Sequence, residues 1–517
     1  MAPAAALGAA LGASLALAPA PARAQSVSPA DSTLVARLLL AEERRDTTRA
    51  AYEDGLRSDN SRIRVIARRG LARSLDPRFA SRDTILPQLP APPRYDDPAW
   101  RLRFRQLGNR NDNCGELRHG ITDSAWAVRL RAADLVTSAC ATDTAIVDTL
   151  RRWTRDLPAS GARRAGGVSW HAAAHGLVAL ARVAPADARS ALTRHATSAI
   201  WQSRAYAARA ATILGDTATL IRLAGDRDDN VKEAAVGGLA RVAGHGADAA
   251  IVPALQASGY QAVRAAAIAL KGTPMRGPAL AAAIAAAVRL RRDSSETSRD
   301  ARQAVVDLIG SLASSGDWPR IAPLAADFDC TIAAAVADIG RQLGDPAARP
   351  VCTSLPITLP PDAVRLAMGG EVRLRVTMAD SSGGGMFVVR LRGDVAPVMA
   401  ARVLDLVRRR YYDGLTWHRV EANFVIQGLS PGASEYVGYP RFFRDELGTV
   451  PHARGTVGMS TRGHDTGDGQ WFINLSDNLR LNRDYTVFAE VTDGITVVDG
   501  VLEGDVVARI EIEDGKR

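Results

Sequence analysis

The stretch Trp417-His418-Arg419-Val420-Glu421-Ala422-Asn423-Phe424-Val425-Ile426-Gln427-Gly428 decides how the C-terminal part of the chain folds. Residues 416–420 and 424–427 are rich in β-branched and aromatic residues, which favour strands, and a polar turn separates them. Arg419, Phe424 and Gln427 lie close enough in sequence to line one concave face. Arginine only donates hydrogen bonds and stays charged, so beside apolar side chains it suits a site that holds a neutral peptide and polarises one amide.

Apolar residues alternate with polar ones on both sides of this stretch, which is typical of strands with one buried face. Gly383-Gly384-Gly385 marks a turn between the first two strands, and Pro397 suits the first turn of an amphipathic helix. The predicted strands cover 372–378, 387–391 and 506–510 and pass through Met459, Leu475 and Val491, and the predicted helices cover 394–410 and 498–502. Many strands with only two helices predict a closed antiparallel barrel.

An ordered set of short motifs runs through the same region. It consists of Ala396-Pro397, Tyr412-Asp413-Gly414, Trp417-His418-Arg419-Val420, Asn423-Phe424-Val425-Ile426-Gln427-Gly428, Phe443-Arg444-Asp445-Glu446, Gly458-Met459-Ser460, Gly469-Gln470-Trp471-Phe472-Ile473-Asn474 and Tyr485-Thr486-Val487-Phe488. With these motifs, residues 383–510 resemble the cyclophilin-type peptidyl-prolyl isomerases. The resemblance implies a domain over residues 369–512 that folds as an eight-stranded antiparallel barrel with two capping helices and isomerises X-Pro bonds.

The resemblance also implies a site in which Arg419 is the catalytic residue. The substrate-binding residues would be Phe424, Val425, Phe472 and Leu481 around the proline ring, Gln427 and Gln470 on the peptide backbone, Ser460 and Thr461 along the main chain, and Tyr485 at the rim. The barrier to rotation of about 18–20 kcal/mol comes from amide resonance, which an arginine aimed at the prolyl nitrogen weakens. This chemistry requires neither a metal nor a cofactor.

The chain departs from the family pattern at four places. Gln427-Gly428-Leu429-Ser430 stands in place of the usual QGGD, Arg480 in place of a common aromatic residue, Thr461 in place of a common asparagine, and Trp471 in place of a phenylalanine. None of these changes removes the arginine, the pocket or the two glutamines. The competing interpretation is a non-catalytic adaptor, in which the barrel only docks Pro-containing segments while the preceding part of the chain binds a partner.

Residues 30–345 have a helical and repetitive pattern, in which Gly and Pro separate segments rich in Ala, Leu, Val and Arg. One short pattern of an aliphatic residue, a base and small residues recurs at 61–67, 125–133, 202–208, 229–235 and 261–267. The steps from Arg204 to Lys232 and on to Arg264 are 28 and 32 residues, the length of one helix pair. This pattern resembles HEAT-type repeats.

Helix pairs of this kind bury their apolar faces by stacking, so an all-α solenoid is expected before the barrel. Its curved surface would bind a protein partner, and a structural spacer is the alternative. Residues 346–368 are expected to form a Pro-rich linker, because Pro356, Pro360 and Pro361 are incompatible with a helix interior. The chain is therefore predicted to be multidomain.

Residues 1–24 are predicted to be a signal peptide, with an apolar centre at Leu11–Leu17 and an A-x-A cleavage site at Ala22-Arg23-Ala24. No basic residue precedes Arg23, so a plain Ala-rich tail is the alternative. The signal peptide predicts an exported protein, periplasmic or secreted. No other apolar run approaches the ~20 residues that a membrane span requires.

The four cysteines fall into two pairs that are local in sequence. We expect disulfides Cys114–Cys140 and Cys330–Cys352, each worth roughly 3 kcal/mol by constraining the unfolded chain. Four buried thiols are the alternative. The cysteine spacings have no zinc-site character.

The net charge of +9 does not indicate nucleic-acid binding. Basic residues number 65, all but three of them arginine, and they are interleaved with 56 acids without a basic run that contains aromatics. His171 and His175 lie one helical turn apart, but no third metal ligand is evident. The loop 463–469 lacks the closing glutamate of a calcium loop, so a Gly-rich turn is the better interpretation.

Overall fold

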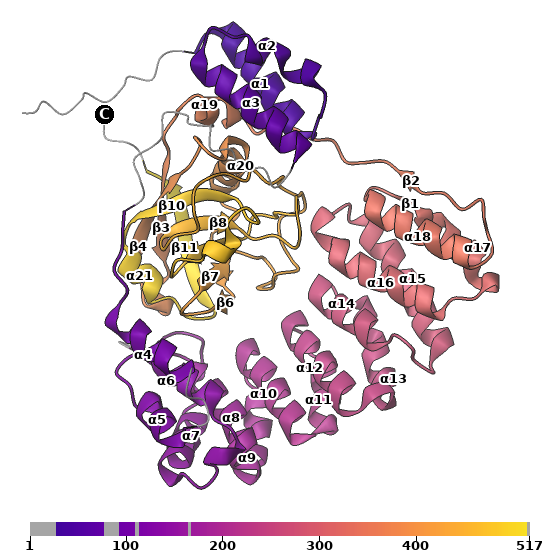
Figure 1. Ribbon diagram of the computed structural model, residues 1–517. Coiled ribbons are helices and arrows are strands. Elements are labelled where there is room, and N and C mark those ends of the chain that lie inside the picture. The colour runs from indigo at the N-terminus through magenta and orange to yellow at the C-terminus, as the bar shows by residue number, and fades with distance from the viewer. Residues whose placement is uncertain (1–26, 77–92, 109–112, 164–166, 514–517) are drawn as a thin grey trace, which may run out of the picture.

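The structure, a computed structural model, describes residues 27–76, 93–108, 113–163 and 167–513. The predicted signal peptide, residues 1–24, lies outside these ranges. Figure 1 shows three parts: an N-terminal group of helices, a curved array of helices, and a C-terminal barrel that sits on the inner side of the curve. No helix among the described residues is long and apolar enough to span a membrane.

The N-terminal group consists of α1 (Pro29–Glu43), α2 (Glu53–Leu56) and α3 (Ser61–Leu75), with a 3-10 turn at Arg49–Tyr52 before α2. Ser28 and Asn60 cap α1 and α3 by accepting hydrogen bonds from backbone N–H groups in the first turn. The buried side chains of Val35, Leu38 and Ile63 belong to the same apolar core as the barrel. The sequence analysis grouped residues 61–67 with the repeats, whereas in the structure this helix packs on the barrel side.

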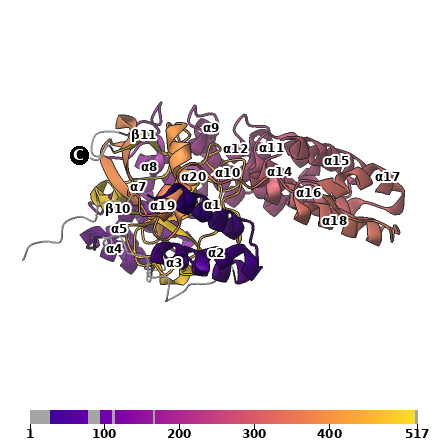
Figure 2. The same cartoon turned by 90° about the horizontal axis from the view of Figure 1, so that it is seen from above.

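The helical array runs from α4 to α18 and curves around the barrel, and its far end, α15–α18, projects beyond the barrel in the view of Figure 2. Its helices are α4 (Ala99–Gly108), α5 (Cys114–Ile121), α6 (Trp126–Leu135), α7 (Thr144–Arg155), α8 (His171–Val183), α9 (Pro185–Ala196), α10 (Trp201–Leu214), α11 (Thr217–Ala224), α12 (Asp229–Val242), α13 (Asp248–Ile251), α14 (Tyr260–Ala269), α15 (Arg276–Arg292), α16 (Arg299–Leu312), α17 (Trp318–Ile321) and α18 (Cys330–Gln342). Aspartates that accept a backbone hydrogen bond in the first turn begin α7, α11, α12 and α18.

The repeated sequence pattern marks one layer of this array. The copies at 125–133, 202–208, 229–235 and 261–267 fall on α6, α10, α12 and α14. Neighbours in this layer pack directly, α10 on α12 and α12 on α14, and their alanines and valines are buried in one continuous core. Stacking therefore buries the apolar face that each helix pair leaves open.

Both disulfides that the sequence predicts are formed in the structure. Cys114 at the start of α5 is joined to Cys140, and Cys330 at the start of α18 is joined to Cys352. Cys352 lies in β2 (Val351–Cys352), which pairs in parallel with β1 (Ala326–Asp327). The second bridge therefore anchors the chain to the end of the array just before it returns to the barrel.

The predicted linker contains more structure than its prolines suggest. Residues 353–360 carry no helix or strand, but α19 (Ala363–Ala367) follows directly and packs on α20 (Pro397–Arg408). Ala363, Leu366 and Ala367 are buried in the barrel core. The segment thus ends as part of the barrel's helical cap.

The barrel is built from strand segments β3 (Arg373–Met378), β4 (Met386–Leu391), β5 (Thr416–Trp417), β6 (Arg419–Val420), β7 (Val425–Gly428), β8 (Thr456–Met459), β9 (Trp471–Asn474), β10 (Val487–Asp493) and β11 (Asp505–Ile512). They pair antiparallel in the order β5-β11-β3-β4-β10-β8-β9-β7-β6. Only His418 separates β5 from β6, so these two segments are one interrupted strand whose halves join the two ends of the sheet. Counted this way, the barrel is closed and has eight strands, as predicted.

Two helices besides α19 cover the barrel. They are α20 and the short α21 (Ile495–Asp499), so the second predicted helix ends earlier than 498–502. Met399, Val403 and Leu406 of α20 point into the barrel core, as the amphipathic pattern indicated. The core fills the interior of the barrel, which leaves its outer face for a site.

Candidate active site

A small apolar cluster lies apart from the two main cores. Val425, Phe472 and Leu481 are buried together, and Phe424 and Tyr485 pack against them at the edge. Because side chains alternate along a strand, β7 directs Ile426 into the barrel core and Val425 to the opposite face. β9 does the same, with Trp471 and Ile473 inside and Phe472 outside. The cluster is therefore a hydrophobic pocket wall on the outside of the barrel.

Arg419 stands beside this cluster on β6. The pairing of β6 with β7 places Arg419 opposite Gln427, and Arg419 Nη1 donates a hydrogen bond of 3.1 Å to Gln427 Oε1. Gln427 Nε2 in turn donates to Ser460 Oγ at 2.9 Å. The Arg419 side chain is 44% exposed, and its nearest carboxylate oxygen, on Glu421, is 4.0 Å away. The guanidinium is thus oriented by one contact, and most of its donors face solvent.

A family model and curated relatives match this part of the chain. The model described as "Cyclophilin type peptidyl-prolyl cis-trans isomerase/CLD" matches residues 374–514. A peptidyl-prolyl cis-trans isomerase of Helicobacter pylori (strain ATCC 700392 / 26695) is 33% identical over 119 residues, which are 22% of this chain and 73% of the relative. The peptidyl-prolyl cis-trans isomerase B of Bacillus subtilis (strain 168) is 33% identical over 132 residues, 25% of this chain and 92% of the relative.

The chain belongs to the cyclophilin-type peptidyl-prolyl cis-trans isomerase family. A crystal structure of a cyclophilin type peptidyl-prolyl cis-trans isomerase from Cryptosporidium parvum, determined in the presence of the dipeptide Ala-Pro, is also similar. It is 22% identical with a TM-score of 0.26, and the match covers 28% of this chain and 99% of that chain. The family model matches the part of the chain that forms the barrel, which we call the isomerase domain from here on.

The pocket wall of the isomerase domain is supported by a histidine that the sequence analysis did not single out. The His452 ring stacks on Phe472, with 5.6 Å between ring centroids, and Tyr485 meets Phe472 edge-on at the same distance. His452 Nε2 shares a hydrogen bond of 3.1 Å with the Tyr485 carbonyl, and burial lowers the pKa of this histidine. Neutral His452 therefore fixes two rings of the pocket. No local sequence signal marks it, because its partners lie 20 and 33 residues away.

Arg480, one of the four departures from the family pattern, covers the edge of the pocket. Its guanidinium lies 4.3 Å from the centroid of the Phe424 ring, and that of Arg419 lies 5.9 Å from the same ring. A cation over an aromatic face is stabilising. Phe424 thus lies near two guanidinium groups, and that of Arg480 is the closer one.

Gln470 does not lie where the resemblance implied. Its side chain is 0% exposed, and its Nε2 donates to the carbonyl of Glu435 at 3.1 Å and to the Asp468 carboxylate at 3.3 Å. It supports the loop 434–437 from beneath and does not face the groove. Thr461 and Ser460 are half-buried at the end of β8, where Ser460 N–H donates to the Gln470 carbonyl.

The two metal candidates from the sequence are engaged with protein groups. His171 Nε2 shares a 2.7 Å hydrogen bond with the Glu503 carbonyl, and His175 bonds to both Asp134 and the Tyr206 hydroxyl. In the loop 463–469, Asp465 accepts from Arg45. The described residues contain no group of three or more side chains arranged to hold a metal ion.

Proposed function

We propose that the chain catalyses cis–trans isomerisation of X-Pro bonds in polypeptides, with Arg419 as the catalytic residue. The single observation that supports this most strongly is the position of Arg419: it is half-exposed, oriented by Gln427, and adjacent to the Val425–Phe472–Leu481 pocket. The pocket has the apolar character that a proline ring requires. Arg419 then lies at the edge where the peptide nitrogen of that proline would sit.

The mechanism follows from the amide bond itself. Rotation about an X-Pro bond is slow because the nitrogen lone pair is delocalised into the carbonyl. An N–H donor of Arg419 that approaches the prolyl nitrogen localises this lone pair only as the bond twists, so it stabilises the transition state more than either ground state. The pocket holds the ring while the preceding carbonyl rotates. No covalent step and no proton transfer is needed.

The test is a comparison of the full chain with two arginine variants. Arg419→Ala is expected to lower kcat/KM on a short X-Pro peptide by about 10²–10³, the scale of one lost transition-state donor. Arg409→Ala is the matched control, because Arg409 forms only an exposed pair with Asp405 on α20. Line-shape or exchange NMR reports the isomerisation directly.

Two outcomes would contradict the proposal. Full activity of Arg419→Ala would remove Arg419 from the mechanism. A wild-type protein that binds the peptide without accelerating its isomerisation would instead support the adaptor, in which the barrel only docks Pro-containing segments.

We also propose that the protein is exported to the periplasm or secreted and assists the folding of exported proteins there. The A-x-A site at residues 22–24 supports export, as do the two disulfides, because such bonds persist in oxidising compartments. Cell fractionation checks this: the mature protein should begin at Gln25 and leave the cytoplasm. Retention in the cytoplasm with all four thiols free would contradict it.

The helical array would serve as an arm that brings client polypeptides to the isomerase domain. Its support is the concave surface that it presents toward the barrel (Figure 1). Deleting the array is not a clean test, because it shares many contacts with the barrel. Point variants on its inner face are the appropriate probes.

A further inference from the structure

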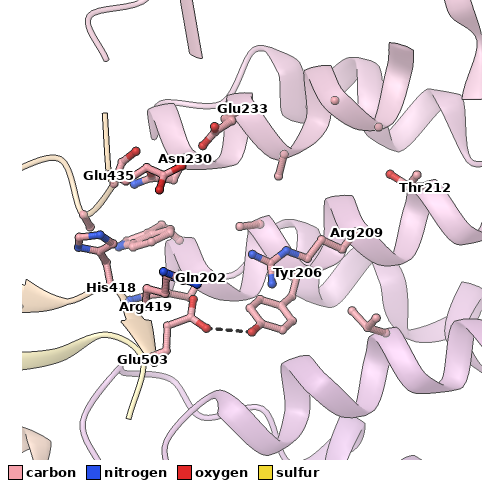
Figure 3. A pocket seen from close by; sticks show the side chains of 18 of the residues that line it. Gln202, Tyr206, Arg209, Thr212, Asn230, Glu233, His418, Arg419, Glu435 and Glu503 are labelled. Carbon is pink, nitrogen blue, oxygen red and sulfur yellow. Dashed lines mark hydrogen bonds between the residues drawn. The ribbon is translucent and has the colours of Figure 1, made fainter. Parts of the chain in front are cut away.

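A pocket of about 700 Å³ lies between the helical array and the isomerase domain, directly beside Arg419. The array contributes residues of α8, α10 and α12, and the barrel contributes His418, Arg419, residues 433–436 and Glu503. Figure 3 shows Arg419 and Glu503 on the barrel side, with Tyr206 and Arg209 of α10 facing them. A polypeptide bound at Arg419 therefore has the array within reach.

The two walls of this pocket are joined by direct hydrogen bonds. The Tyr206 hydroxyl donates to Glu503 Oε2 at 2.9 Å, and Asn230 Nδ2 donates to the Gly432 carbonyl at 3.0 Å. Arg163, which precedes α8, donates to the buried carboxylate of Asp505 at 2.9 Å. The first two contacts involve residues that line the pocket, and the third joins the array to the barrel outside it, so the two parts hold its shape together.

His418 points to a ligand in this pocket. Both of its ring nitrogens are buried and have no hydrogen-bond partner in the structure. Burial, and then the charge of Arg419, lower the pKa of His418 to about 4, so its ring is neutral at neutral pH. A neutral imidazole offers one donor and one acceptor. These match the carbonyl and N–H of a peptide backbone, and leaving them unpaired costs free energy.

Two carboxylates line the pocket close enough to interact. Figure 3 shows Glu233 of α12 and Glu435 of the barrel loop along the same side, near Asn230. Neither forms a salt bridge with any described residue, whereas Glu503 accepts from Tyr206. Burial and then the negative charge of Glu435 raise the pKa of Glu233 to about 7. Two like charges that face the same space attract a cation.

The arginines around these carboxylates are engaged elsewhere. The guanidinium of Arg264 lies over the Tyr436 ring at 4.5 Å, and that of Arg209 lies over Tyr206 at 4.3 Å. Arg182 donates to the Asp134 carbonyl at 2.9 Å. Arg241 is exposed at the rim. None of them forms a salt bridge with Glu233 or Glu435, and the charges of Arg264 and Arg209 offset only part of the rise in the pKa of Glu233.

We propose that this pocket is an extension of the substrate site, which binds the segment beside the isomerised proline and prefers a lysine or arginine side chain received by Glu233 and Glu435. His418 would bind the backbone of that segment between the proline and the basic residue. The inference rests on the proposed function, the isomerisation of an X-Pro bond at Arg419. It adds a specificity that the helical array supplies.

The experiment uses the full chain and a set of X-Pro peptides of about ten residues. An extended chain advances about 3.3 Å per residue, so these peptides are long enough to extend from the proline pocket into the pocket beside Arg419. Within the set, lysine, alanine or glutamate is placed at successive positions on either side of the proline. KM and kcat are measured by NMR exchange, and Kd by calorimetry. At one position, lysine is expected to lower KM about tenfold relative to alanine with little change in kcat.

The double variant E233Q/E435Q is expected to abolish this preference, while E371Q keeps it, because Glu371 forms only an exposed pair with Arg373 outside the pocket. H418F retains the ring volume and is expected to raise KM for every long peptide whatever its charge. An unchanged lysine-to-alanine ratio in E233Q/E435Q would overturn the proposal.

Failure of the proposed function gives a different result. If the wild-type chain turns over no X-Pro peptide, including a short one, the isomerase proposal fails. The calorimetric Kd then still decides whether the pocket prefers lysine, because it needs no turnover.

Discussion

Two surfaces of the barrel use an arginine in opposite ways. Arg73 of α3 is 2% exposed and inserts between the N-terminal helices and the barrel. It donates to Glu42 at 2.8 Å, to the Leu447 carbonyl at 2.7 Å, and to the carbonyls of Val395 and Glu446 at 3.0 and 3.1 Å. Arg419, in contrast, makes one such bond and is 44% exposed.

This difference separates an arginine with a structural role from the one that we propose as catalytic. A guanidinium has five N–H donors and no acceptor. Where the protein satisfies them, as around Arg73, the residue fastens α3 to the barrel and has nothing left for a ligand. Where only one is used, the others remain for the substrate. The first three predictions that follow alter one side of this comparison at a time, and the fourth concerns the pocket beside Arg419.

The largest effect is expected from Arg73→Met, which keeps the apolar stem and removes the charge. Glu42 loses its partner, and the buried Glu446, whose pKa burial already raises to about 7, loses a stabilising charge. Breaking such a buried pair should cost about 3–5 kcal/mol of unfolding free energy, measured by urea denaturation.

The matched control is Arg57→Met on the same group of helices. Arg57 forms an exposed pair with Glu53 four residues away, so the loss should stay below about 0.5 kcal/mol. Equal effects of the two variants would show that the Arg73 network does not hold α1–α3 to the barrel.

The second prediction concerns the catalytic side. Arg419→Lys keeps the charge but loses the planar set of donors, so kcat/KM on a short X-Pro peptide should fall about 100-fold. The unfolding free energy should change by less than about 0.5 kcal/mol, because the side chain makes a single hydrogen bond at the surface. A variant with wild-type turnover would mean that charge alone suffices at this position.

How much of the site the sequence could predict depends on the separation of its parts. Arg419, Phe424, Val425 and Gln427 lie within one pair of adjacent strand segments, so strand periodicity and short motifs place them together. The register of β7 with β9 then brings Phe472 beside Gln427. For these residues, local patterns already contain most of the geometry.

Contacts between segments that are far apart in the sequence could not be predicted from local patterns. Gln470 supports a loop more than 30 residues earlier in the chain. Its neighbours in sequence do not tell whether its amide faces that loop or the peptide groove. Helix α3 has the same pattern as the repeats. Such a pattern indicates which face of a helix is buried, but it does not indicate that α3 packs on the barrel rather than on the array. The pocket of Glu233 and His418 combines residues nearly 200 positions apart, and nothing local marks it.

The third prediction weakens the single bond that orients Arg419. Gln427→Leu keeps a similar volume but removes the acceptor for Arg419 Nη1 and the donor to Ser460 Oγ. An unheld guanidinium spends less time aimed at the prolyl nitrogen, so kcat should fall about tenfold, the scale of one hydrogen bond to a charged group. Ser460→Ala is the control that removes only the outer bond, and its kcat should fall less. Equal loss in both would place the orienting role on Ser460.

The smallest expected effect is the pH dependence of the lysine preference. Burial and Glu435 raise the pKa of Glu233 to about 7, so this carboxyl is mostly protonated at pH 6 and mostly ionised at pH 8. His418, with its pKa lowered to about 4, stays neutral throughout this range. Because only the ionised carboxyl attracts a cation, the KM ratio of alanine to lysine peptides should grow with pH, by roughly threefold between pH 6 and pH 8.

Glu233→Gln should flatten that profile, because the amide that replaces the carboxyl carries no charge at any pH. The pH dependence of the short-peptide rate serves as the internal reference, because a short peptide leaves the pocket of Glu233 empty. A ratio that does not rise with pH would show that the ionisation of Glu233 does not control the lysine preference. In that case Glu435, the other carboxylate of this pair, would be the residue to substitute next.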